Sequence, residues 1–183
     1  MSVSRTKKIL VPLATLTVAG AIAVGSGATF TSTSGNTVST ITTGSLKHTN
    51  SKDGAAVFAL TNLKPGDTVN GSLVIKNTGT LPASFGLTET SSTNGFADKV
   101  AGDNLLKLTI TNVTTGTSVY SGNFGGLADG TRNALADIAP DVSNTFRFSV
   151  TLDQSADNTQ QGKTATAVYA WDSVQLAGET FTQ

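Results

Sequence analysis

The chain has 183 residues, with 12 basic residues, 12 acidic residues and no cysteine. This length suits one domain of roughly 100–200 residues, and without cysteine the chain has neither disulfides nor thiolate chemistry. Three of the basic residues, Arg5, Lys7 and Lys8, lie in a segment that we expect to be removed, which leaves 9 basic against 12 acidic residues, a net charge of −3. A mildly acidic domain does not attract nucleic acid or anionic lipid, so we expect neither as a partner.

The first 28 residues have the order of a secretory signal peptide. A short basic start precedes an apolar run over residues 9–24, and small residues follow. Ser26 and Ala28 fit the small-residue cleavage pattern, so a signal peptidase should cut between Ala28 and Thr29. The alternative is a membrane anchor, but the run is shorter than the roughly 20 apolar residues that span a bilayer. We therefore expect a protein secreted to the cell surface or extracellular matrix, with no stable membrane anchor after cleavage.

Residues 29–43 are uncharged and rich in Thr and Ser, a composition that favours extended backbone. Only Phe30, Val38 and Ile41 are strongly apolar, so this segment cannot bury much surface by itself. One interpretation is a disordered tail. The other is a donor strand that adds to an open sheet edge of a neighbouring molecule, with these three residues as anchors. At about 3.3 Å per residue the segment reaches roughly 50 Å, and a head-to-tail contact of this kind propagates into a homopolymer.

Alternation of apolar and polar residues predicts β-strands along the rest of the chain. The segments with this pattern, or with a composition that favours strands, are 55–60, 69–77, 81–88, 106–111, 146–152 and 164–175. In the last segment Tyr169 and Trp171 share one face and Val168 and Ala170 the other, which predicts a central strand with both faces packed.

Turn and helix signals separate these strands. Pro65 and Gly66, between Lys64 and Asp67, suit the two central positions of a type II turn. Residues 127–138 are expected to hold one short helical turn. Several short strands at this spacing predict an all-β fold, an antiparallel β-sandwich that forms a single domain over residues 44–183.

Few residues offer chemistry. The only histidine, His48, lies in a polar stretch where we expect it to be solvated, and a zinc peptidase helix needs two histidines one turn apart. Asp153 and Asp157 flank a polar turn and could hold calcium, although acidic turns are usually only solvated. Aromatic residues at strand spacing, such as Tyr169 and Trp171, are more often core than a stacking platform for a ligand. We therefore expect no catalytic residue, no metal and no cofactor.

Five elements in order resemble the TasA/camelysin family of secreted proteins from Gram-positive bacteria. The first two are the cleavage region, residues 25–30, and the Thr-Gly-Ser-Leu element, residues 43–46. The most specific is the turn motif Asn62, Leu63, Lys64, Pro65, Gly66 and Asp67. A strand and Asn-x-Gly turn follow at residues 73–81, and the last element is Asn158, Gln161, Gly162, Trp171 and Gln175.

This resemblance implies a jelly-roll-like β-sandwich and a role as the building block of extracellular fibres in the biofilm matrix. It also implies an alternative, because some members are classed as metallopeptidases. The sequence lacks the large insertions and the charged C-terminal tail of the longest members. We expect a structural protein that assembles with copies of itself, with a camelysin-type metallopeptidase as the main alternative and a surface ligand-binding module as a third.

Overall fold

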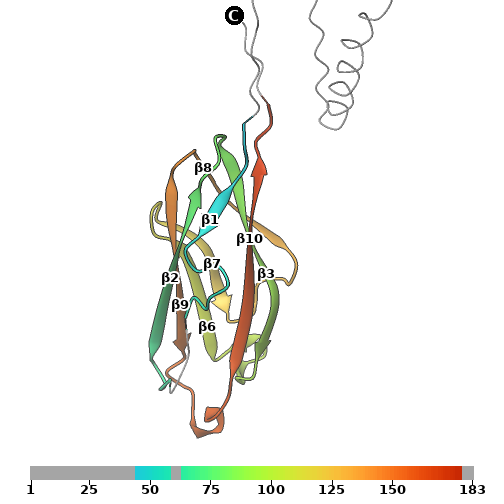
Figure 1. Cartoon of the computed structure of the whole chain (residues 1–183). Coiled ribbons are helices and arrows are strands. Elements are labelled where there is room, and N and C mark those ends of the chain that lie inside the picture. Colours follow the sequence, from blue (N-terminus) through green and yellow to red (C-terminus); the bar gives the residue numbers. More distant parts are fainter. Residues whose placement is uncertain (1–43, 59–62, 179–183) are drawn as a thin grey trace, which may run out of the picture. The chain divides into compact units, whose positions relative to one another are not determined.

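The computed structural model describes residues 44–58 and 63–178, which fold into an antiparallel β-sandwich (Figure 1). Outside the described residues lie the signal peptide over residues 1–28, the segment 29–43, and the predicted site residues Ala28, Thr29, Phe30, Val38, Ile41 and Asn62. Within the described ranges, no helix is long and apolar enough to cross a membrane.

Two sheets form the sandwich, and all their strand pairs are antiparallel, which confirms the predicted fold class. The first sheet has the order β1 (His48–Asn50), β2 (Thr68–Asn77), β9 (Ser143–Leu152), β6 (Leu106–Asn112) and β7 (Thr117–Asn123). The second has the order β10 (Ala165–Gln175), β3 (Ala83–Asn94) and β8 (Arg132–Ile138). The remaining elements are the pair β4 (Asp98–Val100) and β5 (Asp103–Asn104) and the 3-10 turn η2 (Asn158–Gln160).

The core lies between the two sheets, where alternate residues of the inner strands meet. Phe146, Phe148 and Val150 of β9 are fully buried, and so are Phe85 and Leu87 of β3. Burial of each such side chain stabilises the fold by about 1.5–3 kcal/mol. The polar residues between them lie on the outer faces, so the predicted alternation is confirmed for β2, β6 and β9.

Strand β10 covers the predicted range, but its predicted central position is wrong. It is an edge strand, hydrogen-bonded only to β3 within its sheet. On its outer face Val168 and Val174 are 56% and 52% exposed. β-branched residues favour extended backbone on either face of a sheet, so these valines did not indicate burial. Tyr169 and Trp171 do face inward, against the core.

Residues 55–58, the described part of the predicted strand 55–60, form no strand. The chain turns after β1, and Phe58 then packs into the core, with its ring centroid 6.2 Å from those of Phe124 and Phe148. The apolar residues of this segment therefore anchor it to the core through Phe58, and the segment does not pair as a strand.

The helical turn expected in residues 127–138 is also wrong. Strand β8 occupies the second half of this range and pairs with β3. Its inward positions include the half-buried Asn133 and Leu135, a mixture too polar to reveal the period of two. Pairing with β3 decides the conformation here, because short segments follow tertiary context more than local preference.

Candidate interaction groove

Strand β10 offers the longest free edge of the sandwich in the described residues. It has 11 residues, against 3 in β1 and 7 each in β7 and β8, the other edge strands. One edge pairs with β3 along the whole strand. On the opposite edge no backbone hydrogen bond joins β10 to another described segment. Such an edge presents a row of N–H and C=O groups that can pair with an added strand.

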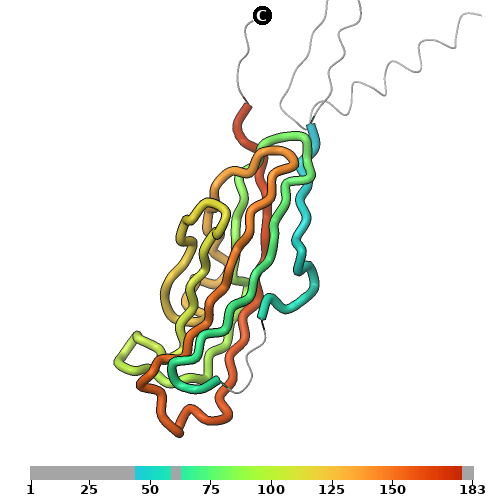
Figure 2. The backbone as a smooth tube through the Cα atoms, turned by 90° about the vertical axis from the view of Figure 1, so that its left-hand side faces the viewer, coloured from blue at the N-terminus to red at the C-terminus, as the bar shows by residue number. Residues whose placement is uncertain are grey.

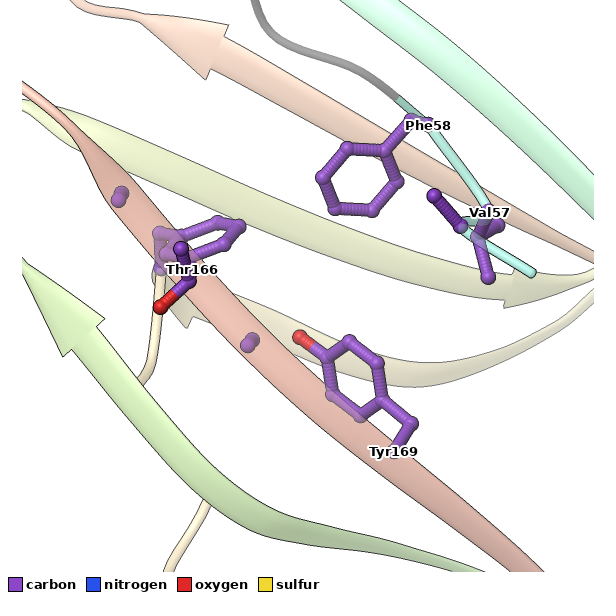
Figure 3. Close-up of a pocket in the computed structure, with 8 residues that line it drawn as sticks. Val57, Phe58, Thr166 and Tyr169 are labelled. Carbon is purple, nitrogen blue, oxygen red and sulfur yellow. The ribbon is translucent and has the colours of Figure 1, made fainter. Parts of the chain in front are cut away.

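Two cavities lie along the first half of this edge and share Ala165 and Thr166. The smaller, about 220 Å³, is mostly apolar and is closed on the other side by Val57 and Phe58 (Figure 3). Its lining residues are Ala56, Val57, Phe58, Phe124, Ala165, Thr166, Ala167 and Tyr169. The larger, about 610 Å³, is lined by residues 63–65, Phe96, Leu152, residues 156–158 and residues 160–166. We call the two cavities and the free edge of β10 the β10 groove.

The predicted turn at Lys64 to Asp67 borders the larger cavity and has the expected geometry. Gly66 has φ 87°, and the Asp67 N–H donates to the Lys64 carbonyl at 2.9 Å. The Asp67 carboxylate in turn accepts from the Lys64 N–H at 2.9 Å. A Cβ on Gly66 would approach only the movable end of the exposed Gln154 side chain, so the positive φ is what requires glycine here.

Part of the last element of the sequence resemblance, Asn158, Gln161 and Gly162, also lines this cavity. The Asp157 carboxylate accepts hydrogen bonds from the backbone N–H and the hydroxyl of Thr159 at the start of η2. These two bonds hold the pKa of Asp157 below its usual range. The buried Gln160 side chain accepts from the Ala97 N–H at 2.9 Å. Asn158, Gln161 and Gly162 therefore lie on a loop that these bonds hold, and they line the same cavity as Leu63, Lys64 and Pro65.

A comparison with protein-family models supplies the decisive observation. The model described as camelysin metallo-endopeptidase matches residues 4–176, nearly the whole chain. The chain belongs to the camelysin family. Comparison with curated proteins gave no match. Parts of two of the five elements that carried the sequence resemblance line the larger cavity, so in this camelysin-family chain some of the signature residues build one end of the β10 groove.

The family description implies a metal, so we tested whether the described residues fit one. They contain no group of three or more His, Cys, Asp or Glu side chains placed to hold a metal ion. Asp153 is committed to its own turn, where hydrogen bonds from Ser155 lower its pKa to about 2, with a smaller effect of Lys99. Asp157 caps η2. Neither aspartate forms part of a calcium cage, and the side chains in the described part of the chain do not fit the metal that the description implies.

His48 is not the solvated surface residue that we expected. Its Nδ1 lies 3.0 Å from the Ser173 hydroxyl, and its ring packs edge-on against Phe85 at a centroid distance of 5.6 Å. The residue thus joins the edge strands of the two sheets.

The aromatic residues of β10 pack between the sheets, as the core interpretation predicted. The Trp171 ring lies 4.8 Å from that of Phe146, and the Tyr169 ring lies 5.2 Å from that of Phe148. Tyr169 also lines the smaller cavity, so this ring belongs to both the core and the β10 groove.

Sequence reasoning missed Glu89, the one fully buried carboxylate among the described residues. It occupies the next inward position of β3 after Phe85 and Leu87. The sequence could have revealed this, because extending the alternation of the predicted strand 81–88 by one residue places Glu89 on the inward face with Phe85 and Leu87. Its partner across the sheet is Tyr169.

Proposed function

We propose that this camelysin-family protein is a secreted structural protein that assembles head to tail into extracellular fibres at the cell surface or in the biofilm matrix. In this proposal residues 29–43 of one molecule form a strand in the β10 groove of the next. The observation that supports it is the edge of β10 that pairs with no other described segment, with the mostly apolar smaller cavity beside it. Main-chain hydrogen bonds along the edge provide affinity in strand addition, and the cavities receive alternate side chains.

The ends of the sandwich favour a chain of like-oriented molecules. The described chain begins at the same end of the sandwich where β10 ends, and the loop between β9 and β10 lies at the opposite end (Figures 1 and 2). That loop borders the larger cavity, where β10 begins. A segment that leaves one molecule at its first end therefore reaches the entrance of the groove on a molecule stacked against it.

This arrangement also sets the strand direction. A segment that connects back to residue 44 of its own molecule runs from N- to C-terminus toward the groove entrance, whereas β10 runs away from it. The added strand is therefore antiparallel to β10, like every other pair in the sandwich. Fifteen extended residues reach about 50 Å and β10 spans about 35 Å at 3.3 Å per residue, so the segment is long enough to follow the whole edge.

Electron microscopy of protein collected from the culture medium tests the proposal. We expect fibres from the wild type and only monomers after deletion of residues 29–43. A subtler variant replaces Phe30, Val38 and Ile41 with serine and should also abolish fibres. Its matched control replaces Thr31, Thr37 and Thr42 with serine and should assemble normally. Fibres of normal width from the deletion variant would refute the donor-strand mechanism.

Because the matching family model is described as a metallo-endopeptidase, peptidase activity is the second candidate function. We propose instead that the protein is not an enzyme, because its only histidine holds Ser173 and its described carboxylates form no metal-binding group. The test is digestion of gelatin or casein by the purified protein with added zinc. Activity that copurifies with the wild type and disappears in His48→Ala would favour the peptidase.

A further inference from the structure

Glu89 lies in the sandwich at a point where the regular pairing of β3 and β10 is interrupted. Its side chain faces inward with no exposed surface. It pairs with Tyr169, but the next pair along the two strands is Ser91 with Val168, so Thr90 is the extra residue of a β-bulge. Bulges occur where a sheet redirects a side chain, and here the bulge immediately follows the buried carboxylate.

In the described part of the chain, the buried carboxylate has no ion-pair partner and no complete hydrogen bond. Neither oxygen of Glu89 has a partner with hydrogen-bond geometry among the described residues, and neither has the Tyr169 hydroxyl. The groups that influence it are Tyr169 from β10, Ser92 from its own strand, and Asp129 from the connection between β7 and β8. Tyr120 on β7 is electrostatically coupled to it. None of these is a cation, so nothing compensates the desolvation of an ionised carboxylate.

Protonation resolves this conflict, because a neutral carboxylic acid is much less costly to bury and can donate a hydrogen bond. Burial is the main cause of a raised Glu89 pKa, and the charge of Asp129 adds to it. The nearby hydroxyls of Tyr169 and Ser92 lower the pKa, but less than burial raises it. Burial and the Glu89 charge together raise the pKa of Tyr169, so the phenol cannot ionise in place of the acid.

We propose that Glu89 is a proton-binding site built into the sandwich, and that loss of its proton weakens the pairing of β10 with β3. The sign follows from linkage. A group whose pKa is higher in the folded than in the unfolded state stabilises the fold fully below the unfolded value, here 4.5. That stabilisation is lost as the pH rises through the folded pKa.

Glu89 is connected to the β10 groove through Tyr169, which pairs with Glu89 and lines the smaller cavity. Deprotonation therefore acts on the strand whose free edge we propose as the acceptor. This last consequence rests on the proposed function, whereas proton binding by Glu89 is a property of the single domain. Both experiments below use the monomeric fraction of the protein from the culture medium, isolated by size-exclusion chromatography, so they measure the single domain whether or not the protein assembles.

The test is the melting temperature of the protein collected from the culture medium, measured as a function of pH. The wild type should lose stability as the pH rises above 4.5. Glu89→Gln, which keeps the shape and removes the charge, should melt higher than the wild type at pH 7 and with a flatter pH profile. The matched control is Asp137→Asn on the exposed side of β8, which should follow the wild-type profile. Parallel profiles for wild type and Glu89→Gln would overturn the proposal.

A second measurement uses the wild type only, so it does not depend on the folding of a variant. NMR titration of the Glu89 side-chain carboxyl carbon should give a midpoint above 4.5. Amide hydrogen exchange should accelerate in β10 across the same pH range after correction for its intrinsic pH dependence, and more than in β9. A midpoint at or below 4.5 contradicts the proposal.

Discussion

His48 Nδ1 lies 3.0 Å from the Ser173 hydroxyl, and this contact joins β1, the edge of one sheet, to β10, the edge of the other. The ring also packs on Phe85. We expect His48→Ala to destabilise the protein by about 1–2 kcal/mol, the sum of one hydrogen bond and one aromatic contact. Thermal denaturation measures the loss. Ser173→Ala removes only the hydrogen bond, so it should cost less, and the double variant should cost less than the two single losses together.

Trp171 should be a main determinant of stability. Its ring packs on Phe146 across the core but stays half-buried, so Trp171→Ala should cost about 3 kcal/mol, the lower end of the range for large aromatic truncations. In a domain of this size that loss lowers the melting temperature by roughly 6–12 °C. A melting temperature equal to that of the wild type, together with loss of a bound ligand, would favour the stacking platform over the core interpretation.

The β10 groove allows a matched pair of blocking variants. Ala167 lines the smaller cavity, whereas Ala170 is exposed on the other face of the same strand. Ala167→Phe should fill the cavity and abolish fibres while the protein stays folded by circular dichroism. Ala170→Phe makes the same chemical change outside the groove and should assemble like the wild type. Equal assembly of the two variants would place the acceptor site elsewhere.

The predicted signal-peptide cleavage can be tested independently of the structure of the β-sandwich. Small residues at Ser26 and Ala28 predict a mature chain that starts at Thr29. Mass spectrometry of protein from the culture medium should give the corresponding mass. Ala28→Lys should block cleavage and leave the precursor with the cells. A precursor of full length in the medium of wild-type cultures contradicts the prediction.

The sequence predicted those parts of the fold in which local pattern and burial agree. Phe146, Phe148 and Val150 alternate with polar residues and are buried as expected. Strand β7 escaped prediction because as a peripheral strand it needs few apolar residues, and its only large apolar side chains, Val119 and Tyr120, are adjacent and do not alternate. The β10 groove could not be predicted, because Phe58 and Ala167 form one cavity only when distant segments fold together. Its family turn was predicted, since Pro65 and Gly66 define it locally.

The chain contains a single tryptophan, Trp171, and it lies between the two sheets in contact with Phe146. Its fluorescence emission therefore comes from one known, half-buried position against the core, on the strand with the free edge. A shift of that emission to longer wavelength reports water entering between the sheets, without any added label. The protein thus carries its own optical probe, with which the opening of this strand can be followed in the intact molecule.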